Sequence, residues 1–469
     1  MVAFIVLLYR SRARALRYYC GMERARRIDA LVAEIGSTTT VVSAFGGLAA
    51  WPESEPRLLG QGVAATSVAE GDVRIGLDLA RERLEALTGP LEPALTLATS
   101  SAAGGLRMTV HGLTHKMTAM AAHEAALGAG GVVEFQTSGK LRDADLARIR
   151  EARPGLILLA GGVEGGDTET VLFNAARLVE LAARPIVVYG GNSAVAGESR
   201  ELLERAGFRV RVTANVYPDV DELDIVPARH VIHDAFEEHI THAPGMEHIA
   251  RFVTGRVLPT PGAVLMAAEA LAGAVGDLVV VDVGGATTDV HSVTDGAPEI
   301  AAIATDPQPR SKRTVEGDLG TYVSAPHVAA LIDAEELPEH LPPAIPESEE
   351  AVLAARTLAH TAAVTAVQRH AGRLVHHYTP TGRQTVARGR DLTACRLLVG
   401  TGGALTRLPG GVEALEATRA PVSGGDRLLP PADALCLLDR EYTLACCGVL
   451  LAHFPAGAVV ALMRRSIGL

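Results

Sequence analysis

Short apolar runs rich in valine and leucine alternate along this chain with amphipathic or alanine-rich stretches. Runs of four or five such residues are typical of buried strands, whereas longer stretches of helical periodicity predict helices. The expected strands are 31–33, 95–98, 156–160, 185–189, 210–212, 278–281, 290–293 and 395–399. The expected helices are 73–87, 112–130, 170–181, 198–206, 263–272 and 350–372. Between 155 and 216 strands and helices alternate, which indicates parallel βαβ units, so the sequence predicts an α/β protein.

The strand that begins at Leu278 ends in the pattern with the clearest chemistry. Its sequence is LVVVDVGGATTDV, and the residues that follow Asp282 are small or carry hydroxyls: Gly284, Gly285, Ala286 and Thr287. Glycine lets the backbone bend sharply and approach a ligand, and free N–H groups with threonine hydroxyls form a cradle for phosphate. An aspartate at the strand end is placed to hold Mg²⁺, usually through water. An ordinary β-hairpin with a glycine-rich turn would show the same local pattern.

Two further stretches repeat this design. The first, LVAEIGSTTTVV from Leu31, places Glu34 before a glycine and a run of hydroxyls: Gly36, Ser37, Thr38 and Thr39. The second, CRLLVGTGGAL from Cys395, ends a strand in a loop of small residues: Gly400, Gly402, Gly403 and Ala404. A loop of this kind that opens a helix points its N–H groups at a ligand. Three such turns favour a nucleotide site over three unrelated hairpins.

Two phosphate hairpins followed by a late glycine-rich loop resemble the ATPase fold shared by actin, Hsp70 chaperones and sugar kinases. That resemblance implies two ribonuclease H-like lobes that close over one nucleotide, with the third loop at the adenosine. The expected domains are a basic extension at 1–30, lobe I at 31–261, lobe II at 262–438 and a C-terminal helix at 439–469 that packs back on lobe I. The βαβ units form a parallel α/β module inserted in lobe I at about 140–226, a candidate second binding surface.

Composition narrows the class of protein. The chain has 469 residues, 48% of them apolar, and a net charge of −11, which argues against a general nucleic-acid or anionic-membrane surface. Five cysteines form no C-x-x-C pair, so they are expected to be reduced thiols of a cytoplasmic protein. The apolar Met1–Leu8 precedes a basic stretch at 9–28, the reverse of a signal peptide and too short to span a bilayer. A membrane-surface role for this arm is an alternative.

Three polar segments leave alternatives open, and a fourth has a single interpretation. Residues 99–107 fit either a ligand-binding turn or a packed one, and the histidines between 227 and 250 fit a metal site less well than a solvated face. In the stretch RTVEGDLG at 313–320, Glu316 and Asp318 are candidates to position a water or join a magnesium shell, with an acidic surface turn as the alternative. Residues 333–350, rich in proline and glutamate, resemble an exposed linker.

Five phrases together resemble one family more closely: EIGSTTT at 34–40, SSAAGGL at 100–106, LAGG at 159–162, DVGGATTD at 282–289 and RTVEGDLG at 313–320. The chain is similar over about 31–455 to the MutL-type family encoded beside adenosylcobalamin-dependent glutamate mutase. The resemblance implies an ATP-driven reactivase or chaperone whose partner is a B12-dependent mutase, with ATP and Mg²⁺ as cofactors. Monomer and homodimer both remain open.

The family pattern assigns roles to the residues already quoted. The hairpin at 36–39, the hairpin at 284–287 and the loop at 400–404 would bind the nucleotide, and Asp282 would position the metal and an attacking water with help from Glu316. The first hairpin usually carries aspartate, and Glu34 extends that metal ligand by one methylene. Alternatives on the same fold are a small-molecule kinase, an iron–sulfur activator of a radical enzyme and a nucleotide-dependent scaffold that does not hydrolyse ATP.

Overall fold

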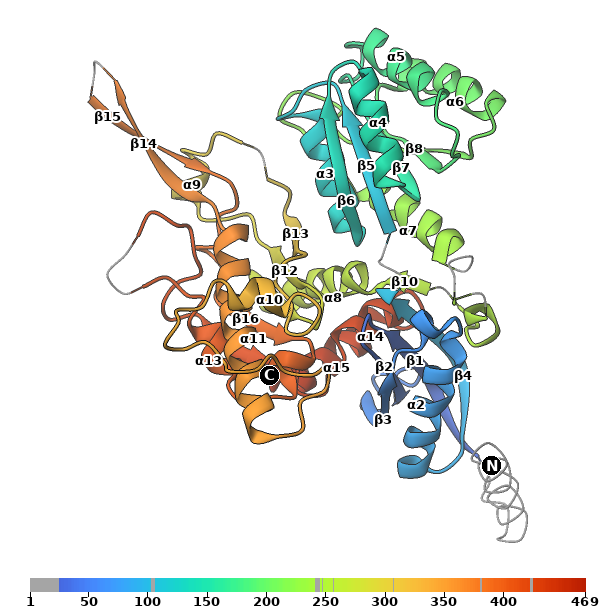
Figure 1. Cartoon of the computed structure of the whole chain (residues 1–469), viewed down its shortest axis with the longest axis vertical. Helices are drawn as coiled ribbons and strands as arrows, with labels where there is room; N and C mark the ends of the chain where they lie inside the picture. The colour runs from blue at the N-terminus through green and yellow to red at the C-terminus, as the bar shows by residue number, and fades with distance from the viewer. Residues whose placement is uncertain are drawn as a thin grey trace.

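The computed structural model describes residues 25–102, 106–240, 245–246, 248–255, 257–306, 308–379, 382–421 and 425–469. Three five-stranded sheets organise the chain, two of them in lobes that flank a central helix and the third in a module above both (Figure 1). The α/β class and the two-lobed architecture with an inserted parallel module are confirmed. Most of the predicted extension at 1–30 lies outside the described residues, which begin just before the first strand.

Lobe I is built on a sheet in the order β10-β4-β1-β2-β3. Its strands are β1 (Arg26–Ile35), β2 (Thr39–Gly46), β3 (Arg57–Ala65), β4 (Leu91–Ser100) and β10 (Val257–Pro259). The first three form an antiparallel meander, and β4 and β10 add parallel strands beside β1. Helix α2 (Val73–Thr88), predicted at 73–87, covers β3 with its buried face.

Lobe II repeats this topology with different residues. Its sheet has the order β13-β12-β11-β16-β17, again an antiparallel meander followed by two parallel strands. The strands are β11 (Leu278–Val283), β12 (Thr288–Val293), β13 (Ser311–Glu316), β16 (Leu397–Thr401) and β17 (Leu435–Leu438). The other elements are α9 (Pro298–Ala301), α10 (Ala325–Ala329), α11 (Glu349–His370), α12 (Gly403–Thr406), α13 (Gly411–Glu416) and the hairpin β14 (Arg373–Thr379) with β15 (Gly382–Arg388).

The inserted module holds a parallel sheet in the order β6-β5-β7-β8-β9. Its strands are β5 (Leu106–Gly112), β6 (Gly131–Ser138), β7 (Leu156–Leu159), β8 (Ile186–Tyr189) and β9 (Val210–Val212). Its helices are α3 (Thr118–Gly128), α4 (Asp143–Ala152), α5 (Glu169–Leu178), α6 (Ala196–Arg205) and α7 (Val226–Ile240). The module therefore begins with β5, and its expected start at about residue 140 is too late. The sequence did not reveal β6 because this strand mixes buried and half-exposed positions and lacks the apolar run that marks a central strand.

Helix α8 (Thr260–Val275) links the lobes and follows β10 at once, so the proline-containing stretch at 258–261 holds the end of a strand and the start of a helix. The C-terminal helices α14 (Leu444–Leu450) and α15 (Ala456–Ile467) pack on α8, and α14 also contacts β1 and β4 (Figure 1). A Cβ atom on Gly448 would stand 2.0 Å from the carbonyl oxygen of Ala263, so α14 and α8 meet at backbone distance. The chain end therefore joins both lobes.

Candidate nucleotide site

The two glycine-containing hairpins that the sequence predicts as phosphate sites are closed by the same backbone hydrogen bond. In the β1–β2 turn the N–H of Gly36 donates to the Thr39 carbonyl at 2.9 Å, and in the β11–β12 turn Gly284 donates to Thr287 at 2.9 Å. In both hairpins the acidic residue stands two positions before this glycine. The duplicated turn follows from the duplicated sheet, since both connect the first two strands of the same meander.

Both turns and the loop after β16 line one cavity of about 550 Å³, a volume typical of small-molecule sites. The predicted residues that line it are Glu34, Gly36, Ser37, Thr38, Thr39, Asp282, Gly284, Gly285, Ala286, Thr287, Gly402, Gly403 and Ala404. At Gly402, φ is +83° and a Cβ would stand 2.5 Å from Oδ1 of Asp282. Glycine is therefore needed where the third loop passes over the strand end of the second hairpin.

Two predicted site residues lie elsewhere. Gly400 is inside β16, packed against leucine side chains that a Cβ would approach to between 2.8 and 3.3 Å, so it serves the core. Glu316 ends β13 outside the cavity lining, and its carboxylate accepts from Nη1 of Arg369 at 2.7 Å. Asp318 shares the same guanidinium. Position next to the hairpin in sequence could not reveal this pairing, because Arg369 comes from α11.

Asp282 faces the cavity without an ion-pair partner among the described residues. Burial raises its pKa well above the usual value, and the nearby carboxylates of Asp289, Glu34 and Asp439 raise it further. Carboxylates gathered in this way repel one another unless a proton or a cation stands between them. The half-buried Asp282 and the buried Glu34 thus fit Mg²⁺, which needs only one or two carboxylates when phosphates complete its shell.

Glu34 is held from the far end of the chain. Its Oε1 accepts a hydrogen bond from the Tyr442 hydroxyl at 2.8 Å, and burial raises the pKa of Glu34 to about 7 against the opposing effect of this bond. Tyr442 has φ of +52°, and the Cζ of Arg407 lies 5.4 Å from its ring centroid. Both side chains line the cavity, and neither was predicted from the sequence. No local signal marks them, since Tyr442 and Glu34 are separated by 408 positions.

Asp439 fixes the segment that carries Tyr442. Its two carboxylate oxygens accept from the backbone N–H groups of Thr443 and Leu444, which start α14, and from the hydroxyls of Thr401 and Ser466. Asp439 is therefore not the N-cap of α14, which is Thr443, and its carboxylate accepts from the N–H groups at the helix start from four residues upstream.

The second hairpin is joined to the inserted module by a buried arginine. Arg313, which is 1% exposed, donates from Nε to Asp289 at 2.7 Å and from Nη1 to the carbonyls of Leu127 and Gly131 at 3.0 Å. Gly130 and Val132, beside these carbonyls, line the cavity. One wall of the site therefore belongs to the module, which the sequence had placed apart from it.

The remaining open segments have clear positions. Ser100 and Ser101 line the cavity, whereas Arg107 pairs with Glu134 and the glycines at 104–105 lie outside the described residues. Pro343, Ala344, Ile345 and Pro346, from the segment expected to be a linker, also line the cavity. Among the described residues no three His, Cys, Asp or Glu side chains gather as a metal site, so the histidines of 227–250 gain no support as ligands there.

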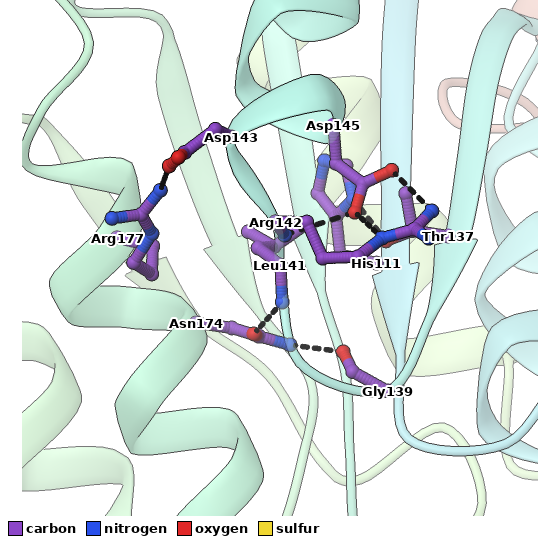
Figure 2. Close-up of polar contacts among 9 residues, drawn as sticks. All are labelled: His111, Thr137, Gly139, Leu141, Arg142, Asp143, Asp145, Asn174 and Arg177. Atoms are coloured by element: carbon purple, nitrogen blue, oxygen red, sulfur yellow. Dashed lines mark hydrogen bonds and ion pairs between the residues drawn. The ribbon is translucent and has the colours of Figure 1, made fainter.

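The carboxyl edge of the module sheet offers few unused polar groups. Figure 2 shows His111, near the end of β5, beside Thr137. Its ring nitrogens lie 2.8 Å from the Thr137 hydroxyl and 3.0 Å from the Thr109 hydroxyl. In the same view Asn174 of α5 holds the β6–α4 turn through the Leu141 N–H and the Gly139 carbonyl. These contacts stabilise the fold of this edge and leave the site between the lobes as the stronger candidate.

Thiols are poorly placed for an iron–sulfur cluster. Cys446 and Cys447 are buried in α14, and burial raises the pKa of each thiol well above its usual value. A cluster needs thiolates, so these two side chains do not favour an electron-delivering role.

Comparison with known proteins identifies the relatives. A family model described as MutL protein matches residues 30–467. Protein MutL of Clostridium tetanomorphum is 35% identical over 460 residues, which cover 92% of this chain and 97% of that protein. No helix among the described residues is long and apolar enough to cross a membrane.

Solved structures resemble the chain only loosely. A nucleotide-free acetone carboxylase has a TM-score of 0.36 at 11% identity, with 90% of this chain and 70% of that chain covered. Component A of (R)-2-hydroxyglutaryl-CoA dehydratase from Acidaminococcus fermentans has a TM-score of 0.30 at 10% identity, covering 94% and 99%. Xylulose kinase from Bifidobacterium adolescentis has a TM-score of 0.29 at 12% identity, covering 92% and 93%.

Proposed function

Because this chain belongs to the MutL protein family, we propose that it is an ATP-dependent reactivating factor for an adenosylcobalamin-dependent mutase of the glutamate mutase type. The observation that carries the nucleotide part is the single cavity lined by the glycine turns of both lobes and by the Gly402 loop. Three turns from distant parts of the chain converge there, which three unrelated hairpins would not do. The mutase part rests on the family resemblance.

In this proposal the triphosphate lies between the hairpins. The backbone N–H groups and hydroxyls of 36–39 and 284–287 surround the phosphates, and the loop at 402–404 contacts the nucleoside. Glu34 and Asp282 would hold Mg²⁺, which would neutralise phosphate charge. Burial and the neighbouring carboxylates raise the pKa of Asp282, and a bound cation would relieve this repulsion.

Nucleotide state would act on the mutase through lobe closure. The cavity is lined by both lobes and by the module, so a ligand that contacts all three biases their arrangement. Hydrolysis then removes part of those contacts and changes the grip on the partner.

A pull-down with the purified chain tests the proposal. Adenosylcobalamin-dependent mutase from the same organism, loaded with hydroxocobalamin as a damaged-cofactor mimic, should bind in one nucleotide state and release its cobalamin during ATP turnover. Asp282→Ala should abolish both turnover and release. Normal ATP hydrolysis by that variant would contradict the role of Asp282. Release of cobalamin from the mutase in the absence of this chain would contradict the reactivase function.

A further inference from the structure

One segment of lobe II exposes apolar side chains beside unpaired acids. Seven large apolar residues between 322 and 353 are at least 44% exposed: Tyr322, Val323, Leu331, Leu337, Leu341, Ile345 and Leu353. An exposed cluster of this kind is uncommon on a surface that faces only water, whereas single exposed apolar residues are ordinary. We call this segment the 322–353 surface.

The charges of the same segment have one sign. Residues 314–355 contain no lysine or arginine, and seven exposed acids lie among the apolar residues: Asp333, Glu335, Glu336, Glu339, Glu347, Glu349 and Glu350. In the part of the chain that the structure describes, none of these seven carboxylates forms an ion pair. The repulsion among these carboxylates is therefore not relieved by ion pairs within the described residues, and a cationic partner would relieve it by pairing with them.

The two ends of the segment meet on lobe II. Helix α10, near the start, packs against α11, which begins at Glu349 near the end. Figure 1 shows the two helices together on lobe II, with the intervening chain looping away from them. The acids and the apolar residues thus lie on a projection of lobe II that is anchored near both of its ends.

This projection is bonded directly to the second phosphate hairpin. The N–H groups of Thr321, Tyr322 and Val323 donate to the carbonyls of Gly284 and Gly285 at 3.1, 2.8 and 2.7 Å. The hydroxyl of Ser324 donates to the Ala286 carbonyl at 2.8 Å. At its other end Pro343–Pro346 lines the cavity. A ligand in the cavity would therefore contact the glycine turn that holds one end of the surface and Pro343–Pro346 near its other end.

We propose that the 322–353 surface is the docking site for a protein partner that presents lysine or arginine residues around an apolar centre, and that nucleotide in the cavity sets the shape of this site. The inference rests on the proposed function, because the partner it expects is the mutase. The seven carboxylates repel nucleic acid and anionic lipid, so the basic partner is a protein. The same repulsion acts against a second copy of this surface.

The test uses the full-length chain and mutase holoenzyme of the same organism on a biosensor, with ATP, with ADP and without nucleotide. Glu335→Lys/Glu336→Lys should weaken binding at least tenfold, and Leu337→Ser at least fivefold. The matched controls Asp78→Lys/Glu82→Lys and Leu87→Ser, on the exposed face of α2, should stay within twofold of the wild type. Nucleotide affinity should be unchanged in all four variants, since none of these residues lines the cavity.

Each outcome decides a different claim. If the wild type binds mutase and the variants at 335, 336 and 337 bind it equally well, the 322–353 surface is not the docking site. The proposed function is unaffected by that result. If the wild type binds mutase in no nucleotide state, the proposed partner fails, and photo-crosslinking from position 337 in native extract judges the surface. A basic protein captured at 337, absent at 87 and lost on Glu335→Lys/Glu336→Lys supports it. Three results overturn the docking surface. They are the absence of any crosslinked protein at 337, the same crosslinked protein at 337 and 87, and a crosslink to the basic arm of a second copy of this chain.

Discussion

The two lobes have sheets and hairpins of the same topology but differ in the segment to which the third strand is hydrogen-bonded. The register aligns Gln61 of β3 opposite Ser43 in the same way that Arg313 of β13 stands opposite His291. Gln61 donates to the carbonyls of Glu441 and Tyr442, whereas Arg313 donates to those of Leu127 and Gly131. The equivalent position thus ties lobe I to the C-terminal segment and lobe II to the inserted module.

The hairpins differ in charge for the same reason. Asp289 of lobe II is matched by Val41 in lobe I, so only lobe II needs a cation at this depth. In lobe I the acid is Glu34, and a neutral tyrosine holds it. The comparison teaches that one duplicated scaffold can carry a buried ion pair on one side and neutral hydrogen bonds on the other, and the substitutions below test it.

The largest effect is expected from breaking the ion pair of lobe II. Arg313→Met leaves Asp289 buried without a partner, and we expect a loss of about 3–5 kcal/mol in the free energy of unfolding. The double change Asp289→Val/Arg313→Met, which copies the apolar position of lobe I, should recover part of this loss. Urea denaturation measures both. Arg396→Met, which breaks an exposed pair with Asp433, should cost less than about 1 kcal/mol.

Next comes the contrast between the two hairpin acids in turnover. Asp282→Asn should lower ATP hydrolysis about 10²–10³-fold, because it removes a charge that faces the cavity without a partner. Glu34→Gln should lower it about tenfold or less, since a glutamine oxygen can still accept from Tyr442. Phosphate release at saturating ATP gives both values. Equal losses in the two variants would show that the lobes contribute alike.

The pH dependence of stability should separate Glu34 from its neighbours. Its folded pKa of about 7 lies above the unfolded value, so the native state keeps a proton that the unfolded chain releases. Stability of the nucleotide-free protein should therefore fall as pH rises from about 4.5 through about 7. Glu34→Gln should remove on the order of 2 kcal/mol of this fall. Denaturation at pH 5 and pH 8 tests it, with the exposed Glu82→Gln as a variant that should match the wild type.

The smallest effect concerns the neutral link of lobe I. Gln61→Leu removes donors to two backbone carbonyls and to the Ser43 hydroxyl, and should cost about 1–2 kcal/mol. Gln61→Leu should also hold Tyr442 less firmly against Glu34. The pH dependence of its stability should therefore shift in the same direction as that of Tyr442→Phe, which lacks the hydrogen bond to Glu34. A destabilisation as large as that of Arg313→Met would contradict the distinction between the lobes.

Sequence patterns gave a good account of what depends on nearby residues. The alternation of 156–212, the helix at 73–87 and the glycine turns were all predicted, since valine runs, caps and tight turns are local signals. The contacts of Tyr442 and Arg407 were missed because they join segments hundreds of positions apart. Pro343–Pro346 were missed because a proline-rich stretch has the composition of a linker wherever it packs. The roles of the thirteen cavity-lining residues and of Glu316 stay predictions until variants are measured.

The position of β10 has a consequence for synthesis on the ribosome. Lobe I completes its sheet only when Val257–Pro259 pairs with β4, after the whole module has been made, and Glu34 meets Tyr442 only near the chain end. Since domains fold as they emerge, the first lobe must wait as an open-edged intermediate until more than half of the chain has been made. A nascent chain released before residue 442 should therefore expose an unfinished sheet to chaperones and acquire its ligand pocket only on full extension.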